Sequence, residues 1–287
     1  MKKTYIALLG SFLILASCKM QHKPELEHQL ITLEDGLSAG QVNVHSDTKA
    51  LAVNTFQYGQ WFDVRFANVS GFTLEQGDMF PDLDITVFNT SGEIILKQES
   101  LLGGLSQPED AVLYGTLTLA NPILSGQSYK AVYRLYDTKS DHELQTEMDF
   151  ELLPDSQITV TPDGLMAKEI YLFNSDTNSV LFGSNTPKAS NISMDFQLLE
   201  GYQKKNGRIH LGMSTKLVDS RGRVLTENKD ALPNFNVEGI TNDQVLKATL
   251  SLNNGRFNSP LRWTVRLWDK NSAAAITATA TLNIENN

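Results

Sequence analysis

A series of short motifs occurs twice in this chain, in the same order and at an almost constant spacing of 128 to 133 residues. A fixed period of this length indicates a duplicated structural unit, so one fold has to suit both copies. The matched segments are 35–37 with 163–165, 46–48 with 175–177, 85–92 with 215–222, 116–119 with 249–252 and 134–137 with 266–269, together with Phe66, Gly71 and Gly77 against Phe196, Gly201 and Gly207.

Inside each copy the local pattern is that of β-strands. Residues 62–66 (Phe-Asp-Val-Arg-Phe) and 148–152 (Met-Asp-Phe-Glu-Leu) alternate apolar and polar side chains, as strands with one buried face do. Residues 89–92 (Asn-Thr-Ser-Gly) and 219–222 (Asp-Ser-Arg-Gly) stand between apolar runs and are typical of hairpin turns. Each copy holds roughly seven or eight such strands.

This pattern predicts an all-β fold made of two tandem repeated antiparallel β-sandwich domains. It is similar to immunoglobulin-like domains only in general pattern, because the cysteine pair of antibody domains is absent. One helical turn is expected to interrupt each copy. The reason is that residues 106–109 (Ser-Gln-Pro-Glu) and 241–244 (Thr-Asn-Asp-Gln) have the form of capping boxes.

The N-terminal segment has the features of an export signal. Lys2 and Lys3 precede a mostly apolar run at 5–15, which is too short to span a bilayer, and Leu-Ala-Ser-Cys follows at 15–18. This order resembles the lipobox of bacterial lipoproteins. The resemblance implies cleavage before Cys18, a diacylglycerol thioether on its sulfur and an acylated amino group, which together hold a protein stably on a membrane. An ordinary secretory signal in which Cys18 has no role is the alternative.

These features divide the chain into four parts. We expect a signal peptide at 1–17 that is removed, a lipidated flexible tether at 18–30, an acidic first β-sandwich at 31–154 and a second β-sandwich at 155–287. The boundary between the domains falls near Pro154, where the last strand pattern of the first copy ends.

The residues after Cys18 bear on where the protein is anchored. In the lipoprotein sorting pattern an Asp directly after the cysteine suggests retention in the inner membrane, and here that residue is Lys19. We therefore expect a lipid anchor in the outer membrane that faces the periplasm. Exposure at the cell surface is the alternative, although Lys19, His22 and Lys23 stand where a surface-export signal would be acidic.

The two copies differ in charge. Residues 30–154 carry 18 Asp and Glu against six Lys and Arg, a net charge of −12, whereas residues 155–287 carry 13 against 14, a net charge of +1. An acidic first half argues against binding to nucleic acid or to an anionic lipid surface. It suits a basic partner or divalent cations, or it serves only solubility.

Two matched Arg–aromatic pairs form the candidate interaction surface. Arg134 and Tyr136 fall on the outward face of one predicted strand, and Arg266 and Trp268 fall on the outward face of its repeat. Stacking and cation–π contacts of this kind suit a protein or carbohydrate ligand. The alternative is that each Arg pairs with a nearby Asp or a neighbouring strand, while the aromatic ring lies under a loop.

An acidic cluster in the first copy gives a weak calcium candidate. Asp78, Asp82 and Asp84 lie near the start of a strand, and carboxylates so placed can ligate Ca²⁺. The second copy has Arg208, Gly212 and Ser214 in the matching positions, so the cluster is either specific to the first domain or a solvated edge. We expect no resident cofactor.

Catalysis has little basis in the sequence. The five histidines lack metal-ligand spacing, and the chain has no nucleophile elbow, zinc-protease motif or phosphate loop. The sequence therefore favours a non-catalytic, lipid-anchored envelope protein that presents a protein-interaction surface, as an accessory or scaffold subunit. An outer-membrane glycan-binding lipoprotein is the main alternative. A hydrolase that uses two acids is a further one.

Overall fold

The computed structural model describes residues 22–25, 30–46, 54–181, 185–186, 190–242, 244–252 and 257–284. Over these residues the chain forms strands, turns and loops, and no described segment is helical. The strands pair in antiparallel sheets, with only two short parallel additions. The predicted all-β fold is therefore confirmed.

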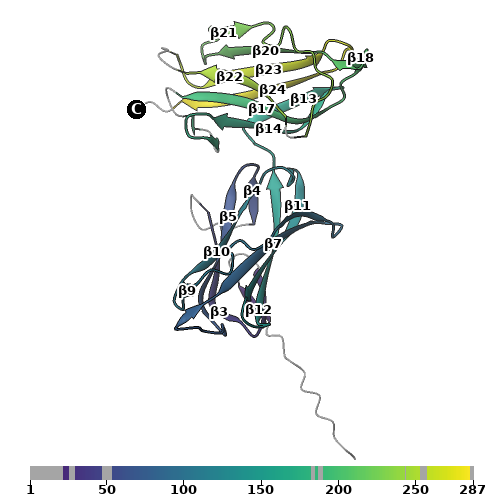
Figure 1. The fold of residues 1–287 in the computed structure, drawn as a ribbon. Coiled ribbons are helices and arrows are strands. Elements are labelled where there is room, and N and C mark those ends of the chain that lie inside the picture. The colour runs from purple at the N-terminus through teal and green to yellow at the C-terminus, as the bar shows by residue number, and fades with distance from the viewer. Residues whose placement is uncertain are drawn as a thin grey trace, which may run out of the picture.

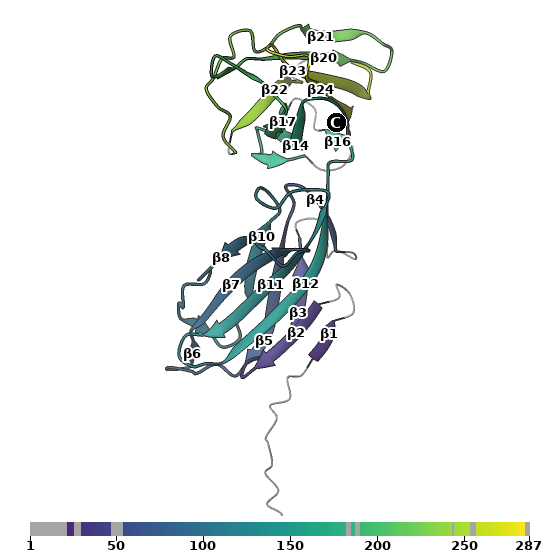
Figure 2. The ribbon, with the colours of Figure 1, turned by 90° about the vertical axis from the view of Figure 1, so that its right-hand side faces the viewer.

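The first half places two sheets on either side of one hydrophobic core (Figures 1 and 2). The large sheet runs in the order β1 (His22–Glu25), β2 (Leu30–Asp35), β12 (Glu143–Leu153), β11 (Gln127–Asp137), β7 (Pro81–Asn89) and β8 (Ile94–Gln98), with β4 (Thr55–Gln57) parallel to β12. The small sheet runs in the order β10 (Leu113–Thr118), β5 (Trp61–Ser70) and β3 (Ser38–His45).

The second half has its own sheets and its own core. Its large sheet runs in the order β13 (Ile158–Asp163), β24 (Ala275–Ile284), β23 (Leu261–Asp269), β20 (Leu211–Val218) and β21 (Val224–Asn228), with β16 (Asn185–Thr186) parallel to β24. Its other sheet runs β15 (Ser179–Val180), β14 (Met166–Asn174), β17 (Asn191–Glu200) and β22 (Val245–Ser251). Two short pairs remain, β6 (Asp78–Met79) with β9 (Gln107–Pro108) and β18 (Lys204–Lys205) with β19 (Arg208–Ile209).

Alternation of apolar and polar residues explains why these segments are strands. On β12 every second side chain from Leu144 to Leu152 is buried, and the residues between them face outward. On β5 the side chains of Phe62, Val64 and Phe66 are fully buried. Successive side chains on a strand point to opposite faces, so this pattern buries one face of each strand against the opposite sheet.

The strand order of the second half repeats that of the first. The run β2-β12-β11-β7-β8 corresponds to β13-β24-β23-β20-β21, and β10-β5-β3 corresponds to β22-β17-β14. The parallel additions β4 and β16 also correspond. The connection between β12 and β13 contains Pro154, where the sequence places the domain boundary. Whether each half folds on its own stays a prediction.

One pair of repeated glycines has a direct structural reason. Gly71 and Gly201 have positive φ angles of 100° and 88°. A Cβ at Gly71 would lie 2.1 Å from the carbonyl oxygen of Gly36, and a Cβ at Gly201 would lie 2.0 Å from that of Gly164. Two chain segments thus approach too closely for any other residue, which accounts for the glycine at both Gly71 and Gly201.

Two local expectations from the sequence are wrong. Residues 106–109 do not form a helical turn, because Gln107 and Pro108 pair with Asp78 and Met79 as a short strand. The predicted tether at 18–30 is not free of structure throughout, because His22–Glu25 pairs with Leu30–Leu33 at the edge of the large sheet. In both cases hydrogen bonds to a neighbouring strand replace the local preference of the segment. Asp243 of the second capping box lies outside the described residues.

The halves touch where β14 and β17 of the second half come next to the β4 end of the first half (Figures 1 and 2). Tyr171 on β14 belongs to the hydrophobic cluster of the first half, and its ring centre lies 5.3 Å from that of Tyr58. No helix in the described part of the chain is long and apolar enough to cross a membrane.

Candidate interaction surface

The sequence-predicted lipidation site lies outside the described residues. Cys18, the signal peptide at 1–17 and most of the tether are not described, so the lipid anchor stays a prediction. The other predicted site residues all lie on described strands, four of them on the outward faces of β11 and β23 and three on or beside β7.

Arg134 and Tyr136 come together on the outer face of β11. The Arg134 guanidinium lies 4.5 Å from the centre of the Tyr136 ring. Its Nη2 lies 2.6 Å from a carboxylate oxygen of Glu143, and its Nη1 lies 3.6 Å from one of Asp84. Burial, and then the carboxylates of Asp84 and Asp82, raise the pKa of Tyr136 to about 12. Because two neighbouring strands already hold Arg134, this pair has little left to offer a ligand.

Arg266 and Trp268 take the corresponding place on β23. The Arg266 guanidinium lies 5.5 Å from the Trp268 ring centre. The Trp268 ring covers Gly212 on β20, where a Cβ would lie 2.2 Å from the ring atoms. The half-buried ring thus packs on the sheet itself. That these two Arg–aromatic pairs form an interaction surface stays a prediction.

The three aspartates of the calcium candidate accept hydrogen bonds from their own loop. Asp82 Oδ1 accepts from the backbone N–H groups of Leu83, Leu102 and Gly103, and its Oδ2 accepts from Ser100. Burial would raise the pKa of Asp82, but these hydrogen bonds outweigh it and hold the pKa below its usual value.

The neighbouring carboxylates are used in the same way. Asp84 accepts from the Ser100 N–H, and Asp78 accepts from the Ser106 hydroxyl. The cluster therefore anchors the loop that follows β8. Among the described residues, no group of three or more His, Cys, Asp and Glu is placed to hold a metal ion.

A surface that the sequence did not single out lies beside this loop. A groove of about 440 Å³ runs between the loop and β10, and its lining combines the apolar side chains of Leu101, Leu102, Val112 and Leu113 with the polar ones of Gln107 and Thr116. Three of the lining residues are large, apolar and exposed, namely Leu101 (41%), Val112 (52%) and Tyr114 (52%), and Leu105 (66%) is exposed in the same loop. A gathering of exposed apolar side chains on one face is a mark of an interaction site.

The groove borders an open edge of the small sheet. β10 pairs with β5 on one side and ends the sheet on the other. In an antiparallel strand about half of the backbone N–H and C=O groups point to each side. Among the described residues, no group outside β5 forms a hydrogen bond with the backbone of residues 113–117. The edge of β10 therefore offers free donors and acceptors next to a groove with exposed apolar side chains.

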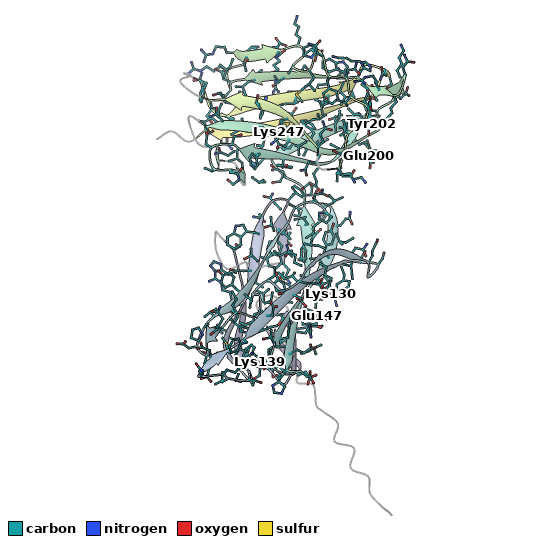
Figure 3. The ribbon with its side chains drawn as sticks, viewed as in Figure 1. Lys130, Lys139, Glu147, Glu200, Tyr202 and Lys247 are labelled. Carbon is teal, nitrogen blue, oxygen red and sulfur yellow. The ribbon has the colours of Figure 1, made fainter. Side chains whose placement is uncertain are left out.

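A larger hollow on the outer face of the first large sheet has a different character. It has a volume of about 710 Å³ and lies over β7, β11 and β12. Lys130 and Glu147 meet across it, with 2.8 Å between Nζ and the carboxylate oxygen (Figure 3). This ion pair occupies two of the three charged groups that line the hollow, and Asp149 is the third.

Comparison with known proteins identifies no family. No protein-family model matches the chain, and no curated protein matches its sequence. Among solved structures, the C-terminal domain of Wzt aligns at 12% identity over 46% of this chain and 80% of that one, with a TM-score of 0.32. Trypsin-activated alpha-2-macroglobulin from Escherichia coli aligns at 7% identity over 91% of this chain and 19% of that one, with a TM-score of 0.27.

A third likeness is to Bacteroides uniformis beta-glucuronidase 2, at 8% identity and a TM-score of 0.25. It covers 79% of this chain and 26% of that one. At these identities and scores the likenesses carry no argument about function.

Proposed function

We propose that the chain is a non-catalytic, lipid-anchored protein of the cell envelope that binds a partner protein along β10. The partner contributes an extended, apolar segment that adds to the small sheet as a further strand. In this role the chain is an accessory or scaffold subunit of an envelope assembly. The observation that carries the proposal is the open edge of β10 beside a groove lined by exposed apolar side chains.

The backbone of β10 is the first element of this recognition. A strand that adds to an open edge forms main-chain hydrogen bonds with the groups that the edge leaves free, and this mode of binding is common in peptide recognition. In natural proteins, charged residues, prolines or bulges protect the edges of sheets that have no partner strand. Residues 113–118 (Leu-Tyr-Gly-Thr-Leu-Thr) contain none of the charged or proline residues that would serve this purpose.

The groove is the second element of this recognition, because the added strand can bury its side chains there. Leu101, Leu105, Val112 and Tyr114 are each at least two-fifths exposed. Covering the exposed part of one such side chain contributes about 1 kcal/mol. Several together, with the main-chain hydrogen bonds, support a specific complex without any deep pocket.

Adding a positive charge to this surface tests the proposal. Tyr114→Lys and Val112→Lys place a charge beside the open edge, where it opposes strand addition. Val224→Lys is the matched control, because Val224 is 47% exposed on the edge strand β21 of the second half. Each variant is cross-linked in the native envelope, and the recovered proteins are measured by quantitative mass spectrometry.

We expect a stoichiometric partner with the wild-type chain and with Val224→Lys, and a strong loss of it with the two β10 variants. Equal recovery of the partner with all the variants would contradict the proposal. Recovery of this chain alone would replace the accessory role with self-association through β10.

The anchor is tested separately. The lipobox at 15–18 predicts that Cys18→Ala releases the protein from membranes, because the acyl chains on this residue supply the membrane affinity. Membrane fractionation of the two forms measures this. A Cys18→Ala protein that remains with the membrane would show that the lipid on Cys18 is not what holds it there.

A further inference from the structure

A cleft of about 650 Å³ lies at the junction of the two halves, and both halves line it. Its volume is within the range of small-molecule sites, which occur preferentially between domains. Tyr58, Trp61 and Asn121 line it from the first half, and Tyr171, Phe173 and Asn178 line it from the second.

One wall of the cleft is fixed by direct contacts between the halves. The Tyr58 hydroxyl donates to Gln197 Oε1 at 2.7 Å and accepts from the Asn121 N–H at 2.9 Å. Nearby, the carboxylate of Glu169 accepts from both the N–H and the hydroxyl of Ser125. The Tyr58–Gln197 and Ser125–Glu169 contacts cross from one half to the other, so the cleft is preformed on that side.

Aromatic rings give the cleft its apolar surface. Tyr58 and Tyr171 are buried and lie with their ring centres 5.3 Å apart, whereas Trp61 and Phe173 are only half-buried. The Lys247 ammonium lies 5.1 Å from the Phe173 ring centre (Figure 3 labels Lys247). Trp61 and Phe173 come from different halves, so partly exposed rings stand on both sides of the cleft.

The polar lining is neutral. Asn121, Asn178 and Gln197 bring amide groups, and Thr118 and Ser179 bring hydroxyls. Amides and hydroxyls can both donate and accept, which matches the hydroxyl groups of a sugar. None of the residues that line the cleft is charged. A charged ligand would therefore find no counter-charge among them.

Together these side chains fit one class of ligand. A sugar ring has an apolar face of C–H groups that packs on an aromatic ring and a rim of hydroxyls that pairs with amides. We infer that the junction cleft binds a neutral oligosaccharide, with Trp61 and Phe173 as the stacking residues and Asn178 as a polar contact. The cleft meets β10 only at its last residue, Thr118, whereas the partner groove is lined by residues 112–116 of that region, so the inference does not depend on the proposed partner protein.

Calorimetric titration of the full chain, purified in detergent, tests the inference. The probes are linear hexasaccharides of glucose, mannose and N-acetylglucosamine. We expect at least one to bind, and Trp61→Ala and Phe173→Ala to weaken it roughly tenfold or more, since each removes a stacking ring. Trp268→Ala is the matched control, because Trp268 packs on Gly212 in the other sheet, and Tyr114→Lys is the control for the partner surface. Neither should change the affinity.

Further variants keep the test decisive where a ring deletion disturbs folding. Asn178 is exposed and has a φ of 52°, so Asn178→Gly keeps its backbone conformation and removes only the amide. Trp61→Phe keeps a ring and should retain more binding than Trp61→Ala. The inference is overturned if none of the three hexasaccharides binds the wild-type chain, or if Trp268→Ala weakens binding as much as Trp61→Ala.

Discussion

The two halves of this chain share a strand order and differ in how they use it. In the second half the loop between β21 and β22 packs Leu232, Phe235 and Val237 against its own core. In the first half the corresponding loop, between β8 and β10, packs Leu102 against its own core but leaves Leu101 and Leu105 exposed. The same architecture thus closes one apolar surface and leaves the other open, which is what one would expect if only the first half binds a partner there.

The edge strands differ in the same sense. Leu113 on β10 pairs with Phe66, and Leu246 on β22 pairs with the matching Phe196. The next residue is Tyr114 on β10 and Lys247 on β22. A lysine on an edge strand discourages the addition of another strand, whereas a tyrosine gives a partner an aromatic contact. Loop and edge therefore both mark the first half as the one that is open for binding.

The largest expected effect tests whether the two halves share the same backbone constraint. Gly71→Ala and Gly201→Ala each force a Cβ to within about 2 Å of a carbonyl oxygen in a backbone conformation with positive φ. We expect each variant to lose about 3 kcal/mol or more of unfolding free energy. In calorimetric melts of the full chain, each variant should lower the transition of its own half.

Gly77→Ala and Gly207→Ala are the matched controls. Both glycines have positive φ, but nothing lies within 4 Å of an added Cβ. They should cost about 1 kcal/mol, from the backbone conformation alone. If Gly71→Ala costs no more than Gly77→Ala, the close approach to Gly36 is not what requires the glycine.

The second prediction compares the two loops. Phe235→Ala should lower the stability of the chain by about 2 kcal/mol, because Phe235 is half-buried against the second core. Leu105→Ala should change stability by less than about 0.5 kcal/mol, since Leu105 is largely exposed. Denaturant melts measure both values.

Partner recovery should show the opposite order. Leu105→Ala should reduce recovery of the cross-linked partner, and Phe235→Ala should leave it unchanged. A stability loss for Leu105→Ala that matches that of Phe235→Ala would mean that Leu105, like Leu102, packs against the first core.

The third prediction compares the two edge residues. Lys247 lies 3.0 Å from Oδ2 of Asp195, a side chain that is almost fully buried. Lys247→Ala should cost about 1 kcal/mol, because it leaves a buried carboxylate with less charge compensation; the exposure of the lysine keeps the cost small. Tyr114→Ala should cost less, since no comparable buried group depends on it. Equal costs in a urea melt would contradict this difference between the edges.

The fold could be predicted from the sequence, because strand patterns are local and the chain contains them twice. The alternation at 62–66 and the glycine pairs predicted features that the structure has. The helical turn predicted at 106–109 was wrong because this segment pairs with Asp78 and Met79. A local motif gives no sign of such a long-range contact.

The candidate surface was harder to predict for a related reason. Leu101, Leu105 and Val112 are of residue types that are usually buried in a core. They stay exposed because of how the loop packs, which the sequence does not reveal. The cleft depends on residues from both halves, such as Trp61 and Phe173, whose proximity has no signal in either copy alone. The Arg–aromatic pairs were visible because both members lie on one strand.

The smallest expected effect concerns the junction between the halves. Glu169 on β14 is buried there, whereas Gln41 takes the matching place on β3 and is exposed. Burial raises the pKa of Glu169 to about 7, although hydrogen bonds from the N–H and hydroxyl of Ser125 oppose the shift. Burial also raises the pKa of Tyr58 to about 12, so this neighbour stays neutral over the same pH range.

The sign of the pH effect follows from this comparison. The folded protein holds the Glu169 proton up to about pH 7, whereas the unfolded chain releases it near the ordinary glutamate pKa of 4.5. Stability therefore falls as pH rises between these values, and the cost of ionised Glu169 is complete above pH 7. We expect the melting temperature to fall by a few degrees between pH 5 and pH 8 because of this group. Glu169→Gln should remove that part of the pH dependence, whereas Gln41→Glu, which adds an exposed carboxylate at the matching place, should not add a similar one. Thermal melts of the three proteins across this range measure the difference, and an unchanged pH profile in Glu169→Gln would show that the junction does not hold the proton.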